Sequence, residues 1–249
     1  SLDACTTGSD NTGLGYGALG GTTTGTNNVA VGNHSLEANT TAANNTAVGY
    51  QALTANTTGT QNTAVGMNAA DANTTSNNVT AVGYAAASAS NANQITAIGS
   101  QALAQSSEAG TAVGYAALFA NTTGTNNVAV GDSAMISNTT GAENTSVGAL
   151  SSDALTTGNG IVALGYKALS SDTKGNRAVA LGHESLANQN FTTSTNNYNV
   201  AVGFQAMFNT TTPDDNVAVG HNALFNNTTG ALNTAVGKSA LENNTTASS

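Results

Sequence analysis

Three histidines are the residues of this chain best suited to bind a metal ion or a proton. His34, His183 and His221 carry imidazole rings, which are the commonest nitrogen ligands for zinc. They occupy neighbouring positions of the internal repeat described below, but in different copies of it, which we expect to lie far apart. Separated rings cannot converge on one ion, so the sequence predicts exposed histidines and no metal site.

Two short motifs resemble ligand-binding loops. The segment Gly13–Gly17 has the glycine density of a nucleotide-binding loop, but no strand–helix–strand unit surrounds it. Asp214 and Asp215 could bind a cation weakly, although a solvated polar turn is the simpler interpretation. No set of residues resembles a catalytic triad or a pair of catalytic carboxylates. We therefore predict that the protein is not an enzyme and requires no cofactor.

Six aromatic residues share one position of the repeat, directly after its glycine. They are Tyr16, Tyr50, Tyr84, Tyr115, Tyr166 and Phe204. We expect some of them to project from comparable places on successive copies, as spaced aromatic rungs. Packing between chains is the favoured role, and a face that stacks on sugar rings is the alternative.

Asparagine precedes threonine throughout the chain, and these segments repeatedly read Asn-x-Thr, the acceptor pattern for N-glycosylation. The candidate acceptors are Asn39, Asn45, Asn56, Asn73, Asn121, Asn138, Asn209, Asn227 and Asn244. The alternative is that stacked repeats hide these amides in a column, in which each amide bonds the copies above and below. The hidden column is the favoured interpretation.

All of these residues are positioned by a repeat of about 17 residues, which recurs fourteen times. Its marker is the glycine after an Ala-Val pair: Gly15, Gly32, Gly49, Gly66, Gly83, Gly99, Gly114, Gly131, Gly148, Gly165, Gly182, Gly203, Gly220 and Gly237. A fixed short period of this kind is the signature of a solenoid. We expect one all-β parallel solenoid over residues 1–249, with coils beginning near residues 11, 28, 45, 62, 79, 95, 110, 127, 144, 161, 178, 199, 216 and 233.

Within one coil, positions are counted from this glycine as position 0. Positions −3 to −1 alternate β-branched residues with alanine, as in Val29-Ala30-Val31, which predicts a short strand that the glycine ends. A second short strand is expected through positions +3 and +4, where leucine is common. Asn-Thr-Thr-Gly at +7 to +10 predicts a turn whose glycine supplies a positive φ. Changes in repeat length, such as the insertion around Phe191–Ser194, are confined to that turn.

Composition excludes several classes of protein. Charged residues make up 7% and aromatic residues 4% of the chain, which is too little for an ordinary globular core, whereas 39% hydrophobic residues is too much for a disordered chain. A net charge of −9 with four basic residues argues against nucleic acid as a partner. No stretch approaches the roughly 20 apolar residues of a membrane span, so membrane insertion is not expected.

The segment from Asn45 to Leu53 reads Asn-Thr-Ala-Val-Gly-Tyr-Gln-Ala-Leu. It resembles the head repeats of trimeric autotransporter adhesins and, still more, the repeat shafts of phage tail fibres and related bacterial surface proteins. The resemblance extends over essentially the whole chain, although the adhesin-head repeat is shorter and the adhesin stalk and anchor have no counterpart in this sequence. It implies parallel β-rolls, left-handed in the adhesin heads, and three chains bundled into a fibre.

We therefore expect a non-enzymatic structural protein of an extracellular or surface fibre, which assembles with itself and has surface glycans as a further partner. The alternative is an ice-binding or carbohydrate-binding solenoid that uses columns of threonine and asparagine. Adjacent threonines in a turn point in different directions, which weakens this alternative because a hydroxyl lattice needs them aligned.

Both ends of the sequence fall inside a coil. Ser1–Asp10 fits positions +3 to +12, with Leu2 on the leucine position and Cys5 on the asparagine position. Neither end shows a polar capping repeat, which predicts continuation end to end, either as part of a longer chain or by stacking of subunits. Cys5 is the one cysteine, so it forms no intrachain disulfide and is a candidate link between subunits.

Overall fold

The computed structural model of the chain describes residues 3–248, and these form an all-β solenoid of stacked coils without a helix. The coils group into two compact units, one ending at Thr123 and the other beginning at Gly124. The predicted fold class is confirmed in both units. Residues 3–248 accordingly contain no helix that could cross a membrane. Leu2, expected on the leucine position, lies outside the described residues.

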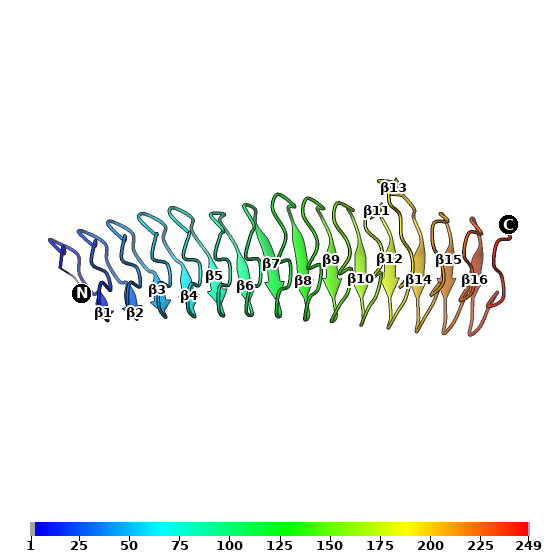
Figure 1. The fold of residues 1–249 in the computed structure, drawn as a ribbon, viewed down its shortest axis with the longest axis horizontal. Helices are drawn as coiled ribbons and strands as arrows, with labels where there is room; N and C mark the ends of the chain where they lie inside the picture. Colours follow the sequence, from blue (N-terminus) through cyan, green and yellow to red (C-terminus); the bar gives the residue numbers. More distant parts are fainter. Residues whose placement is uncertain (1–2, 249) are drawn as a thin grey trace. The chain divides into compact units, whose positions relative to one another are not determined.

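In the first unit, seven short strands pair in parallel and in chain order (Figure 1). They are β1 (Thr12–Leu14), β2 (Val29–Val31), β3 (Thr46–Val48), β4 (Thr63–Val65), β5 (Thr80–Val82), β6 (Thr96–Ile98) and β7 (Gly110–Val113). Pairing joins identical repeat positions, so that Ala47 of β3 lies beside Ala64 of β4. Each strand covers the positions that the alternating pattern predicts.

The second unit repeats this arrangement and adds a small sheet in the turn region. Its main parallel strands are β8 (Asn127–Val130), β9 (Thr145–Val147), β10 (Val162–Leu164), β12 (Val179–Leu181), β14 (Val200–Val202), β15 (Val217–Val219) and β16 (Thr234–Val236). The two-residue strands β11 (Gly175–Asn176) and β13 (Thr195–Asn196) pair with each other. Because β13 directly follows the predicted insertion around Phe191–Ser194, the insertion is accommodated in the turn.

Alanine fills the inward face of the strands. Ala47 and Ala64 at position −2 are fully buried, whereas Val48 at −1 is half-buried. The small side chain lets the opposite wall of the coil approach closely, and that wall supplies the leucine at +4, such as Leu53, which is also fully buried. The core of each unit is therefore a column of alanine facing a column of leucine.

The second strand expected through positions +3 and +4 is absent, and this prediction was wrong. The segment is a turn in which residues +2 and +4 have positive φ, 55° at Gln51 and 50° at Leu53. The N–H of Gln51 donates to Asn33 in the preceding coil, and that of Leu53 donates to Ala69 in the following coil. Leucine seldom adopts positive φ, so burial of its side chain between coils outweighs the local backbone preference.

The glycine at position 0 ends each strand, as predicted. Gly49 has a φ of 138°, and a Cβ added there would lie 2.6 Å from the carbonyl carbon of Gly66 in the next coil. The glycine at +10, by contrast, does not supply the positive φ that the turn pattern predicted. Positive φ falls instead at −5, with values of 61° at Asn44 and 60° at Gln61. The chain thus turns two residues after the predicted point.

Candidate functional site

The asparagines at position +7 form the expected internal column. The Asn56 side chain donates from Nδ2 to Asn39 Oδ1 in the preceding coil, at 3.3 Å, and to the carbonyl oxygen of Gly59 within its own turn, at 3.0 Å. Both asparagines are fully buried. The Asn56 amide therefore connects its coil to the preceding one and closes its own turn. Its Oδ1 has no hydrogen-bond partner among the described residues, so the predicted bonding of every amide to the copies both above and below is not complete.

A second asparagine column, at position −4, was missed at the sequence level. The Asn45 Nδ2 donates to the carbonyl oxygen of Gly59 at 2.8 Å, and Asn45 Oδ1 accepts from the backbone N–H of Asn62 at 2.9 Å. One side chain thereby satisfies a buried backbone carbonyl of its own coil and a buried backbone N–H of the following coil. The available signal was the recurrence of asparagine directly before the strand: Asn11, Asn28, Asn45, Asn62, Asn127, Asn144, Asn199, Asn216 and Asn233.

Most of the candidate glycosylation acceptors are inaccessible in the folded coils. Fully or almost fully buried are Asn39, Asn45, Asn56, Asn73, Asn121, Asn138 and Asn227. Asn209 and Asn244 are half-buried. The inclusion of Asn45 was wrong on sequence grounds as well, because Thr46 and Ala47 follow it and the acceptor pattern needs a hydroxyl two residues on.

One copy carries a carboxylate in the +7 column. Asp172 is fully buried, and its oxygens accept hydrogen bonds from Gln189 Nε2 at 2.7 Å and from the backbone N–H groups of Gly175 and Phe191 at 2.9 and 3.1 Å. Burial raises the pKa of the Asp172 carboxyl above its ordinary value, although these hydrogen bonds act in the opposite direction. The site can therefore hold a proton at a higher pH than an exposed aspartate.

The aromatic residues at position +1 project to solvent as predicted. Tyr50, Tyr84 and Tyr115 are each about half exposed, at 48%, 49% and 53%. Together with exposed strand residues at −1, such as Ile98, they form an apolar stripe along the first unit. Tyr166 and Phe204 at +1, with Leu164 and Val219 at −1, form the corresponding stripe in the second unit.

Histidines continue this aromatic column, which corrects the expectation that all three lie far apart. His183 lies between Tyr166 and Phe204, with ring centroids 5.1 and 5.2 Å away; its ring is tilted by 40° to Tyr166 and stacks on Phe204. Phe204 in turn stacks on His221 at 5.3 Å. His183 and His221 are separated by a single coil. Their shared repeat position with the tyrosines was the signal that could have identified the stack.

The remaining predicted residues do not come together. The Gly13–Gly17 segment begins within β1 and continues into a turn, Asp214 and Asp215 are exposed, and Cys5 is an exposed free thiol. Among residues 3–248, no group of three or more His, Cys, Asp or Glu side chains could hold a metal ion. These positions therefore offer no common site.

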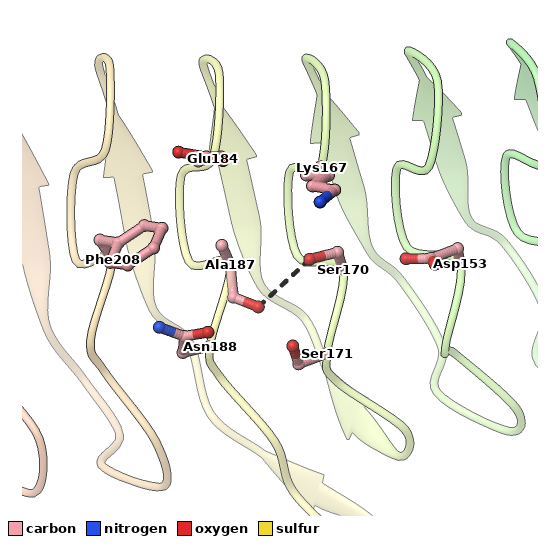
Figure 2. A pocket seen from close by; sticks show the side chains of 8 residues that line it. All are labelled: Asp153, Lys167, Ser170, Ser171, Glu184, Ala187, Asn188 and Phe208. Carbon is pink, nitrogen blue, oxygen red and sulfur yellow. Dashed lines mark hydrogen bonds between the residues drawn. The ribbon is translucent and has the colours of Figure 1, made fainter.

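A recess of the second unit is lined by residues close to its aromatic column. It has a volume of about 320 Å³ and is lined by Asp153, Lys167, Ser170, Ser171, Glu184, Ala187, Asn188 and Phe208. Figure 2 shows Phe208 and Asp153 at opposite ends, Lys167 and Glu184 along one rim, and Ser171 and Asn188 along the other. All eight belong to repeat positions +2, +5 or +6, which face outward from the coil.

Comparison of the chain with protein-family models, with curated proteins and with solved structures found no match. The likeness to adhesin heads and tail-fibre shafts therefore rests on the repeat motif, and the structure supports it at the level of a parallel β-solenoid.

Proposed function

We propose that this chain is a non-enzymatic structural module of an extracellular or surface fibre, in which copies of the chain pack side by side through the apolar stripe. The observation that carries the proposal is the stripe itself, formed by exposed residues at −1 and +1 on successive coils. Large apolar side chains exposed on successive coils are costly in water and are typical of an interaction face. In the first unit it includes Tyr50, Tyr84, Ile98 and Tyr115.

The uniform coils support a structural role. Most coils repeat the same alanine, glycine and asparagine contacts with their neighbours, so stability accumulates along the stack. The resemblance of the repeat to fibre shafts suggests three chains in the assembly and a location on a cell or virion surface. The number of chains and the location are thus part of the proposed function.

The threonine hydroxyls at position +8 have an internal use, so this column does not support the ice-binding alternative. The hydroxyls of Thr40 and Thr57 at position +8 donate to the carbonyl oxygens of Thr57 and Thr74 in the next coil, at 3.1 and 3.0 Å. Their protons are therefore engaged between coils and are not directed toward an outside ligand.

The test is the mass of the protein in solution, measured by light scattering at micromolar concentration. The full chain should form a discrete oligomer, and the double variant Tyr84→Ser/Tyr115→Asn should lower its mass while leaving the far-ultraviolet circular dichroism unchanged. Serine and asparagine already occupy position +1 at Ser100 and Asn33, so both replacements suit the coil.

The control variant is Asn33→Ser, which exchanges one polar residue for another in the same column and should leave the mass unchanged. A folded, monomeric wild-type chain at micromolar concentration would refute the proposal.

A further inference from the structure

We propose that the recess around Ala187 is a carbohydrate site, which binds one pyranose ring of a neutral saccharide. The recess exists because position +5 is small in two successive coils, Ser170 and Ala187, and large in the coils on either side, Asp153 and Phe208. The hollow is therefore a notch between two larger side chains of the outward +5 column.

The lining has the mixed character that sugars require. A pyranose presents hydroxyl groups around its edge and apolar C–H groups on its faces, so its sites combine hydrogen-bonding side chains with an aromatic platform. Phe208 closes one end of the recess, and Phe225 stacks on it with ring centroids 5.3 Å apart, which holds the Phe208 ring in place. The Phe208 ring is thus a platform for the apolar face of a sugar.

The polar groups around the recess have free hydrogen-bonding capacity. Asp153 closes the end opposite Phe208, and its partly buried carboxylate interacts with the backbone N–H groups of Asp153 and Ala154 and with the charge of Lys167. Glu184 accepts from Gln205 through Oε2 at 2.7 Å, which fixes the carboxylate and leaves Oε1 for a ligand. Asn188 donates through Nδ2 to Asn209 Oδ1 at 3.3 Å, so its own Oδ1 can accept from a hydroxyl group. These acceptors suit a ligand that is rich in hydroxyl donors.

Charge selects the type of saccharide. The recess contains the carboxylates of Asp153 and Glu184 and one cation, Lys167, whose Nζ lies 5.4 Å from the centroid of the Tyr166 ring. The excess of negative charge disfavours uronic and sialic acids and leaves neutral hexoses as the ligand class. A volume of about 320 Å³ falls at the lower end of the range for small-molecule sites, as a single ring bound at a surface requires.

A recess at the same repeat position, +5, occurs in the first unit. It has a volume of about 420 Å³ and is lined by Asp3, Tyr16, Gly17, Gly20, Gly21 and Glu37. Its floor is also a small residue at +5, Gly20, placed between acidic residues at +5 in the coils on either side. An aromatic ring, Tyr16, again lies at the edge. The combination of notch, carboxylates and aromatic ring thus arises twice at one face of the repeat.

The experiment is calorimetric titration of the full chain with cellotetraose and maltotetraose as neutral probes and trigalacturonic acid as the anionic probe. At least one neutral probe should bind at millimolar or lower concentration, and the acid should bind more weakly. Phe208→Ala should reduce affinity roughly tenfold, because the aromatic platform is removed.

The decisive variant is Ala187→Phe, which fills the notch. Phenylalanine already occupies +5 at Phe119, Phe208 and Phe225, so the coil accepts it. The matched control is Ile136→Phe, which places the same ring at +5 in a coil outside both recesses, where the side chain is already large. Ala187→Phe should abolish the binding of the neutral probe that Phe208→Ala weakens, and Ile136→Phe should preserve it.

Two results would overturn the proposal: no binding of either neutral probe at ten millimolar, or binding that Ala187→Phe and Phe208→Ala both leave intact. The site does not depend on the proposed assembly. Light scattering of Ala187→Phe should show the wild-type mass, so a failure of saccharide binding and a failure of oligomerisation are separate outcomes.

Discussion

Replacing Gly165 with alanine should destabilise the second unit more than any change to its exposed side chains. Gly165 has a φ of 140°, and an added Cβ would lie 2.6 Å from the carbonyl carbon of Gly182 and 3.0 Å from the backbone nitrogen of His183. The obstructing atoms are backbone atoms of the next coil, which is itself held by strand pairing with β14. They cannot move aside by a change of side-chain rotamer.

The expected cost combines two terms. A backbone conformation that non-glycine residues rarely adopt costs about 1–3 kcal/mol. Overpacking against a close neighbour costs about 1–3 kcal/mol more. Gly165→Ala should therefore lower the free energy of unfolding by roughly 2–6 kcal/mol, the sum of these two ranges.

Gly160 provides a matched control five residues before Gly165. Its φ is 67°, and the nearest atom to an added Cβ is Arg177 Cγ at an ordinary distance of 3.6 Å. Asparagine occupies the same position with nearly the same φ at Asn27 and Asn44. Gly160→Asn should therefore be neutral or stabilise the fold by about 0.4–1 kcal/mol, because it restricts the unfolded chain.

The assay is guanidinium denaturation followed by circular dichroism, together with hydrogen exchange of peptides from the affected coils. Gly165→Ala should lower the denaturation midpoint and accelerate exchange in β10 and β12, whereas Gly160→Asn should do neither. If the two variants shared the wild-type midpoint within error, the close approach of successive glycines could not be a constraint on the fold.

Two further predictions concern buried polar groups. Asn144→Ala removes the acceptor of the Ile161 N–H, at 2.9 Å, and the donor to the Gly158 carbonyl, at 2.8 Å. The free energy of unfolding should therefore fall by about 1–3 kcal/mol for each backbone group that is left unpaired. An unchanged denaturation midpoint would contradict this prediction. The pKa of the Asp172 carboxyl is higher in the folded chain than in the unfolded chain, so the folded chain binds this proton more tightly. The group therefore contributes stability at pH values below the ordinary aspartate pKa. This stability is lost as the pH rises through the folded pKa. Acidification from neutral pH toward about pH 4 should therefore raise the thermal midpoint, and Asp172→Asn should flatten this dependence; equal slopes in the variant and the wild type would count against it.

The strands and their register could be predicted from the sequence because both depend on a strict pattern. Alternation of Ala with β-branched residues before a glycine specifies one buried face, and a slip by one residue would expose it. The parallel pairing of Val29 with Thr46, and of Ala30 with Ala47, follows directly from the repeat period. The repeat period therefore predicted the fold class without any comparison with related proteins.

The turn between +2 and +4 could not be predicted, because its conformation contradicts local preference. Leu53 has a φ of 50°, in a region that favours glycine and asparagine. The conformation persists because it buries the leucine against the alanine column and lets alternate N–H groups donate to the coils on either side. Such a balance depends on neighbouring coils, and a single repeat does not reveal it.

The candidate site was equally hard to predict, since it is made by small side chains at one repeat position in two successive coils. Each coil contacts only its neighbours, so a substitution at an outward position is felt by two coils at most. The inward columns of alanine, leucine and glycine are constrained by contact on every side, whereas +1, +2, +5 and +6 can vary from coil to coil. A recess such as that at Ala187 can therefore be created without altering the backbone. It follows that the binding specificity of this chain would depend on which outward positions are small, acidic or aromatic in adjacent coils. Because these positions are about 17 residues apart in the sequence, no contiguous sequence motif describes such a site.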